Sequence, residues 1–456
     1  MELPLVSCFD QINHSRRSRK ERLFFGSNPA NAGAGGLLHG FSLRVSSEIL
    51  APDFDPQWHD GPPGGADLPV SRAAAGGGGG AAAPPYRNDF GWRGGPEVLS
   101  YDDMAGPNDL LKATARSFYL TLRVLPARVR PQIGLAYLLA RTTDTVADTE
   151  LIPPAQRLDA LARLRERILG QTAARLDLGE LARRQGSPAE KLLLEKVENS
   201  LAALSTLAPA DLQCVRDVLA TITSGQELDL RRFAPLAPAL QGAGDQPKSE
   251  RQPVIALATA AELDDYTYRV AGCVGEFWTR LCRAHLFPDA RLDEKQFVAD
   301  GIRFGQGLQL VNILRDVPAD LKNGRCYLPL EKLTPARLAP DTMLRPEHAE
   351  KFLPLFRAHL DVAAAHLAAG WRYTNALPFG QFRVRLACAW PVLLGARTIE
   401  KLRAAGVAEL QQRVKVSRGE LRGMLVRSLL ACPAPFLWRK LYGTTAKAVA
   451  SGGNLA

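Results

Sequence analysis

Residues 308–320 read LQLVNILRDVPAD and join an apolar helical run to a pair of acidic residues. Gln309, Asn312 and Asp316 follow one another at three- and four-residue spacing, so they share one face of the predicted helix. A buried amide without a hydrogen-bond partner costs free energy, and polar side chains on such an apolar helix therefore indicate an internal polar site.

An earlier segment, DTVAD at residues 144–148, repeats the acidic spacing. Asp144 and Asp148, like Asp316 and Asp320, are four residues apart and would lie on one helix face. Like charges at this spacing destabilise an isolated helix by a few tenths of a kcal/mol. A functional role is therefore the expected reason for these paired aspartates. Magnesium uses one or two protein carboxylates and completes its shell with water and phosphate oxygens. A solvated acidic face is the alternative interpretation of either motif taken alone.

Basic residues surround both acidic motifs. Arg141 precedes the first, whereas Arg315, Lys322 and Arg325 flank the second. Guanidinium groups match phosphate oxygens in bidentate geometry. An acidic pair at the end of an apolar helix and beside such cations indicates a ligand with an apolar body and a diphosphate head.

Pro318 interrupts the second motif. Proline lacks the backbone N–H of a helix and clashes with the preceding turn, so it predicts an end or a kink near Val317. Asp316 and Asp320 would then lie on either side of a kink.

A third segment, YTYRVAGCVGE at residues 266–276, is rich in small residues. Glycine within a helix costs about 1 kcal/mol and usually has a packing or functional reason. Ala271, Gly272 and Gly275 would permit either close helix packing or open space for a long apolar chain. Both interpretations remain open at this point.

Composition limits the class of protein. The chain has 456 residues, 46% of them hydrophobic, and a net charge of +10, which favours an anionic partner: nucleic acid, a membrane surface or a phosphorylated substrate. No recognition motif supports nucleic acid. Its seven cysteines are scattered without a CxxC pair, which indicates reduced thiols in the cytoplasm and argues against zinc. No apolar run is long enough for a transmembrane helix, and no secretory signal is evident.

The chain divides into three predicted parts. Residues 1–105, with five consecutive glycines at 76–80, favour a disordered extension, and a transit-type presequence is the alternative. Residues 106–445 show helical periodicity and form one all-α domain, and residues 446–456 form a flexible tail. The segment from Phe233 to Pro253 is expected to be a surface loop. The predicted helices are 108–126, 131–148, 153–170, 188–206, 209–229, 255–285, 291–322, 346–374, 379–404 and 417–430.

Taken together and in order, these motifs resemble those of the squalene/phytoene synthase family, most closely a bacterial-type squalene synthase. The resemblance is strong from Pro107 to Pro329 and includes the element RSFY at 116–119 and GRCYLP at 324–329. It implies an isoprenoid-synthase fold, a single all-α domain around a central cavity.

The resemblance also assigns roles to residues. It implies that Asp144, Asp148, Asp316 and Asp320 hold Mg²⁺ on the substrate diphosphates, and that Tyr266 is the catalytic tyrosine. Substrate-binding positions are implied for a further set: Ser117, Phe118, Arg141, Gln309, Asn312, Arg315 and Arg325.

The implied reaction is a head-to-head condensation of two farnesyl diphosphates through presqualene diphosphate, followed by reduction with NADPH to squalene. Phytoene, dehydrosqualene or hydroxysqualene, formed without NADPH, is the alternative product, and a non-catalytic family member is a third interpretation. The choice of squalene rests on VKVSRG at 414–419, which resembles a basic segment near the nicotinamide cofactor and makes Lys415 and Arg418 candidate NADPH ligands. The alternative for this segment is a basic helix cap.

We expect a cytoplasmic protein with peripheral membrane contact, since the implied product is an insoluble hydrocarbon. The basic and apolar segment 425–442 is a candidate for lying on an anionic membrane surface. Its alternative is a final helix that packs on the core.

Overall fold

The computed structural model describes residues 110–111, 114, 118–149, 151–233, 253–412 and 414–450, with the side chains of 118–120 and 444–450 left out. These residues belong to one compact unit. The predicted disorder of residues 1–105 and nearly all of the predicted loop 233–253 lie outside the described residues. Helix α19 (Pro435–Ala450) extends into the segment predicted to be a flexible tail.

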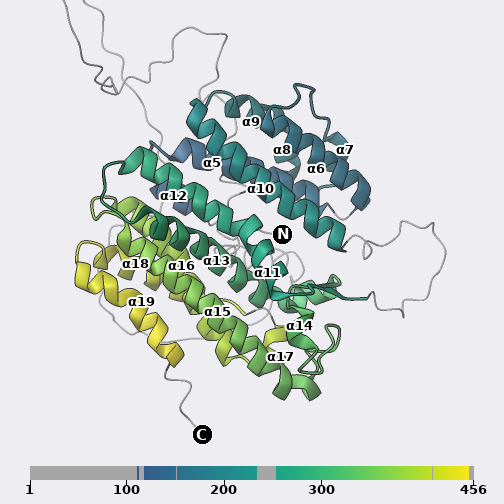
Figure 1. Ribbon diagram of the computed structural model, residues 1–456, viewed down its shortest axis with the longest axis vertical. Helices are drawn as coiled ribbons and strands as arrows, with labels where there is room; N and C mark the ends of the chain where they lie inside the picture. Colours follow the sequence, from purple (N-terminus) through teal and green to yellow (C-terminus); the bar gives the residue numbers. More distant parts are fainter. Residues whose placement is uncertain are drawn as a thin grey trace, which may run out of the picture. The chain divides into compact units, whose positions relative to one another are not determined.

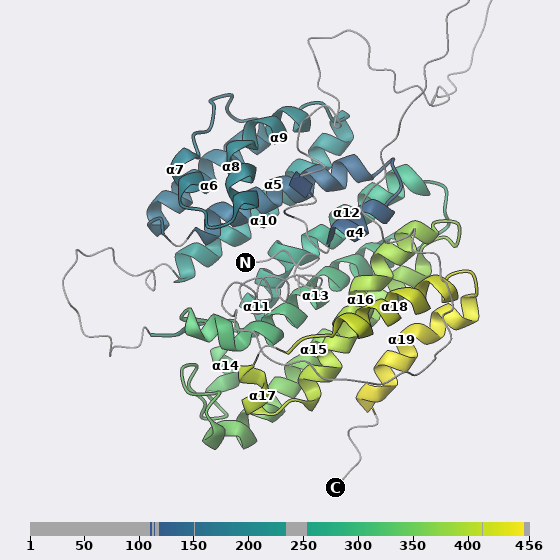
Figure 2. The ribbon, with the colours of Figure 1, turned by 180° about the vertical axis from the view of Figure 1, so that it is seen from behind.

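The all-α prediction is confirmed, and α13 (Glu294–Lys322) lies at the centre of the helical bundle. It packs against α12, α15 and α16, while α10 packs against α5, α6 and α12 (Figures 1 and 2). The bounds of the other main helices are α4 Phe118–Val124, α5 Arg130–Asp148, α6 Pro154–Leu169, α8 Pro188–Glu195, α9 Val197–Leu204, α10 Pro209–Phe233, α11 Ala260–Thr267, η4 Tyr268–Gly272, α12 Cys273–Leu286, α15 Ala349–Ala376, α16 Phe382–Ala404 and α18 Arg418–Ala431.

Several predicted helix limits need correction. The predicted helix 188–206 is two helices, α8 and α9, and the predicted helix 255–285 begins only at Ala260. Short helices were not predicted because they have too few turns for a helical period to be recognised. They are α7 Gly179–Arg183, α14 Leu330–Leu333 and α17 Val407–Gln411, whereas η5 Pro346–His348 is a short first part of the predicted helix 346–374.

A two-residue parallel β-ladder takes the place of the first residues of the predicted helix 255–285. Strand β1 (Ile255–Ala256) pairs with β2 (Arg325–Cys326), and the amide of Ile255 donates to the carbonyl of Gly324 at 2.9 Å. Gly324 has a φ of 72°, which lets the chain turn sharply after α13. The ladder thereby holds Arg325 beside the end of α13.

The predicted end of the helix near Val317 is wrong, because α13 continues through Pro318 to Lys322. The alternative, a kink at this position, stays a prediction. Proline removes one hydrogen bond from the helix. Packing of α13 against α12, α15 and α16 stabilises the helix in spite of this loss. Asp316 and Asp320 therefore remain on one continuous helix.

The glycine-rich segment brings two helices into near backbone contact. A Cβ added to Gly275 on α12 would lie 1.9 Å from the carbonyl oxygen of Gly301 on α13. Similarly, a Cβ at Gly305 would lie 2.1 Å from the carbonyl oxygen of Ala271. Close packing, one of the two interpretations of these small residues, is thus confirmed.

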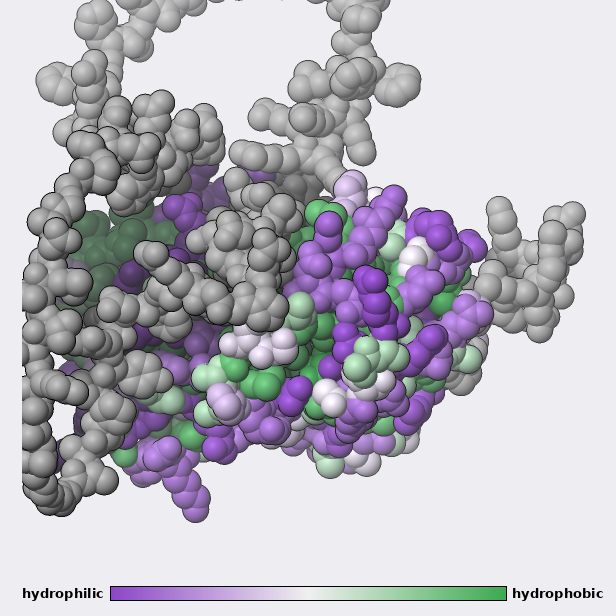
Figure 3. All heavy atoms as spheres, turned by 90° about the horizontal axis from the view of Figure 1, so that it is seen from above, coloured by the Kyte–Doolittle hydropathy of each residue, from purple (hydrophilic) through white to green (hydrophobic). Residues whose placement is uncertain are grey.

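The described surface is mainly polar. In Figure 3 hydrophilic residues of the described chain predominate on the visible face, and hydrophobic ones occur in small groups. Within the described ranges, no helix combines the length and the apolar character that crossing a membrane requires.

Replacing Gly275 by alanine is expected to lower the free energy of unfolding by about 1–3 kcal/mol, because the added methyl group would overlap the carbonyl of Gly301. Gly419→Ala in α18 is the matched control, since a Cβ there would meet no atom within 4 Å. Denaturant unfolding measures both variants. Equal stability of Gly275→Ala and wild type would contradict the close approach of α12 and α13.

Candidate active site

A polar cavity of about 580 Å³ lies at one end of α13. Asp148 reaches it from α5, Asp316 and Asp320 from α13, and Tyr266 from α11. The segments containing the two acidic motifs are distant in sequence, and they line the same hollow. The full lining consists of Asp148, Tyr266, Gln309, Asn312, Ile313, Arg315, Asp316, Pro318, Ala319, Asp320, Lys322, Asn323, Arg325, Tyr327, Leu410 and Gln411.

Asp144 lies beside this cavity rather than in its wall. It lines a smaller hollow of about 10 Å³, together with Asp148, Asp229 and Arg325. Its carboxylate accepts a hydrogen bond from Arg141 at 2.6 Å. Arg141 also pairs with Glu190 of α8 at 2.6 Å, so it bridges two carboxylates. The structure thus places Asp144 and Arg141 one layer behind the lining of the larger cavity.

The second acidic motif carries an electrostatic cost. Burial and the nearby charge of Asp316 raise the pKa of Asp320 to about 7, although Arg325 acts in the opposite direction. The buried guanidinium of Arg315 donates to Asp316 from Nε at 3.0 Å and also from Nη2. One carboxylate of the motif is therefore held by arginine, and the other is unfavourably charged at neutral pH.

Two amides in the wall of the cavity have unsatisfied polar atoms. Gln309 is 4% exposed and Asn312 is 5% exposed. The side-chain oxygen of Gln309 and both polar atoms of the Asn312 amide have no hydrogen-bond partner among the described residues. Buried polar atoms are rarely left unpaired, so these amides indicate a bound polar ligand.

Tyr266 belongs to a chain of buried hydrogen bonds. Its hydroxyl donates to Tyr327, whose ring stacks on it with a centroid separation of 4.8 Å. The Tyr327 hydroxyl in turn donates to the Asp229 carboxylate at 3.1 and 3.2 Å. Burial raises the pKa of Tyr266 well above 10, so its phenol is neutral at physiological pH.

Sequence reasoning missed Asp229 and Gln226, which project from α10 into the smaller hollow. The signal was present: the buried stripe Val215, Val218 and Ile222 continues at helical spacing into these two polar residues. Burial raises the pKa of Asp229 to about 6, although Arg325 at 3.8 Å and Tyr327 oppose the shift. Tyr327 was part of a quoted motif, but no role was predicted for it.

For two predicted site residues the structure gives no placement. Ser117 lies outside the described residues, as does the side chain of Phe118, whose backbone begins α4. Lys415 and Arg418 are exposed and do not line the cavity.

The segment around them instead forms a helix start. Ser417 and Glu420 make a capping box for α18, and Lys401 donates to the carbonyl of Lys415 at 3.1 Å. The helix-cap interpretation of this segment thus describes what the structure shows.

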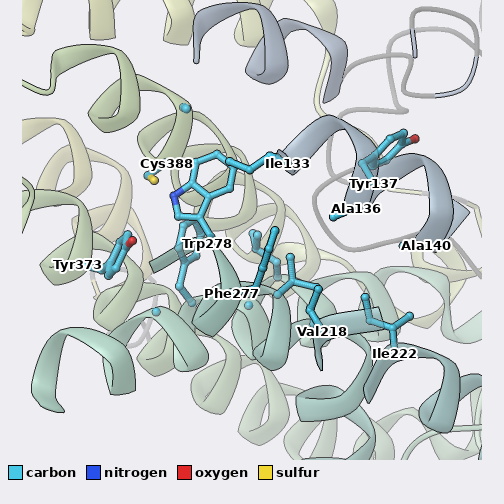
Figure 4. A pocket seen from close by; sticks show the side chains of 18 residues that line it. Ile133, Ala136, Tyr137, Ala140, Val218, Ile222, Phe277, Trp278, Tyr373 and Cys388 are labelled. Carbon is cyan, nitrogen blue, oxygen red and sulfur yellow. The ribbon is translucent and has the colours of Figure 1, made fainter. Parts of the chain in front are cut away.

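A narrow apolar tunnel of about 70 Å³ runs inside the bundle, between α5, α10, α12 and α13 (Figure 4). Ala136 and Ala140 line it from α5, the helix that ends at Asp148. Gly275 and Ala271 also line it, so these small residues leave space as well as allowing close packing. Trp278, Tyr373 and Cys388 line another part of the tunnel.

The residues at the polar cavity suit a hard divalent cation that arrives with its ligand. No three Asp, Glu, His or Cys side chains among the described residues gather closely enough to hold a metal ion by themselves. Magnesium does not require such a cage, because water and phosphate oxygens complete its shell. The charged oxygen donors Asp148, Asp316 and Asp320, with an uncompensated charge at Asp320, fit this mode of binding.

Replacing Asp229 by asparagine is expected to stabilise the protein at high pH. The pKa of about 6 in the folded state exceeds the ordinary 3.8, so the stability due to the protonated carboxyl is present below pH 3.8 and is lost as the pH rises through 6. Asparagine cannot ionise and retains an acceptor for Tyr327. At pH 8 in EDTA, Asp229→Asn should therefore exceed wild type by roughly 2–3 kcal/mol in free energy of unfolding, and at pH 4 it should not.

Asp217→Asn is the control, because Asp217 is exposed on the same helix. Denaturant unfolding at both pH values measures the effect. If the gain from Asp229→Asn did not depend on pH, the buried-charge interpretation of Asp229 would be wrong.

Comparison with known proteins places these features in a family. The family model described as squalene/phytoene synthase matches residues 111–420. The 15-cis-phytoene synthase of Synechocystis is 29% identical over 270 residues, 58% of this chain and 66% of that protein. The squalene synthase of Saccharomyces cerevisiae is 25% identical over 241 residues, 52% of this chain and 49% of that protein. The chain thus spans about half to two thirds of the length of these relatives.

A solved structure shows the same fold. The complex of TcSQS with the ligand E5700 superimposes with a TM-score of 0.61 and 21% identity, and it covers 76% of this chain and 91% of that one. The family model covers all of the described site, from the first acidic motif on α5 to α17. The chain belongs to the squalene/phytoene synthase family.

Proposed function

We propose that the protein is a prenyltransferase that condenses two isoprenoid diphosphates head-to-head. The observation that carries this proposal is the convergence of Asp148 from α5 with Asp316 and Asp320 from α13 on one polar cavity. An apolar tunnel formed partly by the same two helices suits prenyl chains.

The carboxylates would hold the diphosphate through Mg²⁺. Asp148, Asp316 and Asp320 are the expected ligands at the cavity, with Asp144 behind them. When bound, magnesium supplies positive charge that makes diphosphate a better leaving group. Arg325 and Lys322 in the cavity wall add cationic charge beside the same group, and the unpaired amide nitrogen of Asn312 can donate a hydrogen bond to it. The unpaired side-chain oxygen of Gln309 can accept a hydrogen bond from water bound to the ion.

The apolar tunnel protects the reaction from water. Loss of diphosphate leaves an allylic carbocation, which water would capture. The polar and apolar side chains line different spaces. The carboxylates line the larger cavity, and Phe304, Leu308 and Ile222 line the tunnel. The double bond of the second prenyl chain can then attack the cation before water does.

This attack leaves a tertiary carbocation on the second chain, and loss of a proton then closes the cyclopropane ring of presqualene diphosphate. Removal of that proton would use the buried hydrogen-bond chain. A carbocation is acidic enough to protonate a neutral phenol oxygen. Tyr266 accepts that proton as its own passes to Tyr327, and the proton of Tyr327 passes to Asp229. The three side chains are already hydrogen-bonded in this order. The released diphosphate is the alternative acceptor.

We propose farnesyl diphosphate as substrate, presqualene diphosphate as intermediate and squalene as product, with NADPH as reductant. The support for NADPH is the resemblance of segment 414–419, and the exposed positions of Lys415 and Arg418 away from the cavity lend it no geometric support. Phytoene, dehydrosqualene and hydroxysqualene are the competing products. The presence of all four motif aspartates and Tyr266 argues against a non-catalytic member.

Incubation with farnesyl or geranylgeranyl diphosphate, with and without NADPH and Mg²⁺, tests this proposal. We expect Mg²⁺-dependent diphosphate release, and squalene from farnesyl diphosphate only when NADPH is present. Mass spectrometry of the extracted hydrocarbon identifies the product. Detection of phytoene or dehydrosqualene would show that squalene is not the product. The absence of any C30 or C40 product with magnesium would overturn the proposed activity.

Replacing Tyr327 by phenylalanine removes the hydroxyl that links Tyr266 to Asp229. We expect kcat to fall about 10- to 100-fold with little change in KM, since the ring still stacks on Tyr266 but cannot relay a proton. Initial rates with farnesyl diphosphate provide the measurement. Tyr268→Phe is the control, because Tyr268 donates to Glu276 and does not line the cavity. An unchanged kcat in Tyr327→Phe would favour diphosphate as the acceptor.

A further inference from the structure

Helices α18 and α19 present an unusual surface to solvent. Every exposed residue between positions 421 and 440 is aliphatic, aromatic, proline or cationic. Leu430 is 71% exposed and Phe436 is 66% exposed. We call this set the α18–α19 surface: Arg422, Val426, Arg427, Leu429, Leu430, Pro433, Pro435, Phe436, Leu437, Arg439 and Lys440.

Buried side chains hold this surface firmly on the bundle. On α18, Leu421 and Ser428 are buried, and the indole N–H of Trp390 on α16 donates to Ser428 at 2.9 Å. On α19, Trp438 is 1% exposed and stacks on Trp371 of α15 with a centroid separation of 5.6 Å. The exposed apolar residues therefore do not result from a loosely attached helix.

The outward residues follow helical spacing. Val426, Leu429 and Leu430 continue the stripe that begins at Arg422, on the side of α18 opposite to Ser428. The helices lie at the outer edge of the bundle in Figures 1 and 2, drawn in yellow-green and yellow. An apolar stripe that faces outward is the reverse of what solvent favours, so a partner that covers it is expected.

Phe379 extends the same surface. The guanidinium of Arg385 lies over the ring of Phe379 at 5.7 Å and over the ring of Trp438 at 5.1 Å. Phe379 is 53% exposed, and it joins the end of α15 to α19 through this shared arginine. An exposed aromatic ring at the end of α15 thus shares an arginine with the helix that carries the α18–α19 surface.

The positive charge of the C-terminal residues indicates which kind of partner covers the α18–α19 surface. The sequence has no Asp or Glu after Glu420, whereas residues 421–456 contain Arg422, Arg427, Arg439, Lys440 and Lys447. Apolar side chains bordered by cations are complementary to an anionic lipid surface, where each Lys or Arg contributes about 1 kcal/mol. A second copy of the chain would bring the same cations against one another, which disfavours a symmetric dimer through this surface.

We propose that the α18–α19 surface docks the protein on the surface of an anionic phospholipid bilayer. The side chains of Leu429, Leu430, Phe436 and Leu437 enter the boundary between headgroups and acyl chains, and the cations contact lipid phosphates. The contact is peripheral and does not depend on the reaction that the enzyme catalyses.

Co-sedimentation of the full chain with vesicles tests the proposal. Phosphatidylcholine vesicles are compared with vesicles that contain 40% phosphatidylglycerol. We expect at least tenfold stronger partitioning to the anionic vesicles in 0.1 M NaCl and a marked weakening in 1 M NaCl, because salt screens exposed charges. Equal partitioning to both vesicle types would overturn the proposal.

Two variants locate the contact, each with a matched control. Leu430→Ser/Phe436→Ser should weaken binding at least tenfold, whereas Leu151→Ser/Val362→Ser, which changes residues 62% and 47% exposed elsewhere, should not. Arg439→Glu/Lys440→Glu should also weaken binding at least tenfold. Its control, Lys351→Glu/Arg357→Glu on α15, alters the net charge equally and should have a smaller effect on binding.

Two further readouts separate the alternatives. Turnover with detergent-dispersed substrate should be unchanged in the α18–α19 variants, so a failure of the proposed reaction would not be mistaken for a failure of docking. Size-exclusion chromatography with light scattering reports the oligomeric state. A wild-type oligomer that dissociates in Leu430→Ser/Phe436→Ser, or vesicle binding that survives both surface variants, would overturn the membrane proposal.

Discussion

Carboxylates from helices that are far apart in the sequence are buried at one end of the bundle, and the cost of burying their charge is the constraint on which the site depends. The pKa of Asp320 is raised to about 7 and that of Asp229 to about 6, mainly by burial. Arginines relieve only part of this cost: Arg315 holds Asp316, Arg141 holds Asp144, and Arg325 lies near Asp229. A divalent cation on a diphosphate would relieve the rest, which links the stability of this region to its ligand.

Backbone packing places the polar cavity next to an apolar space. Near contact between Gly275 and Gly301 draws α12 against α13, and the same small residues leave room for the tunnel. The elements that carry charge and the elements that exclude water are therefore the same helices. A substrate with an anionic head and an apolar tail matches this division.

The sequence allowed most of the long helices to be predicted, since an apolar period over many turns leaves little choice. Pro318 misled the prediction because local propensity favours a break, whereas α13 packs against α12, α15 and α16 and continues through the proline. Asp229 was missed because one acidic residue on a long helix resembles an ordinary surface charge. Only the fold reveals that it faces Tyr327 and Arg325. For Lys415 and Arg418 the role as NADPH ligands stays a prediction from resemblance, because the fold leaves both residues exposed.

Affinity for farnesyl thiodiphosphate, measured by isothermal titration calorimetry with Mg²⁺ and with EDTA, tests the central claim most directly, since this unreactive analogue separates binding from turnover. The claim predicts tight binding only with Mg²⁺, and at least tenfold weaker binding in both Asp148→Asn and Asp316→Asn, which lie on different helices. Exposed Asp289→Asn should bind as wild type does. Binding that is equally tight in EDTA, or that is unaffected by either cavity substitution, would contradict the convergence of the two motifs on a diphosphate.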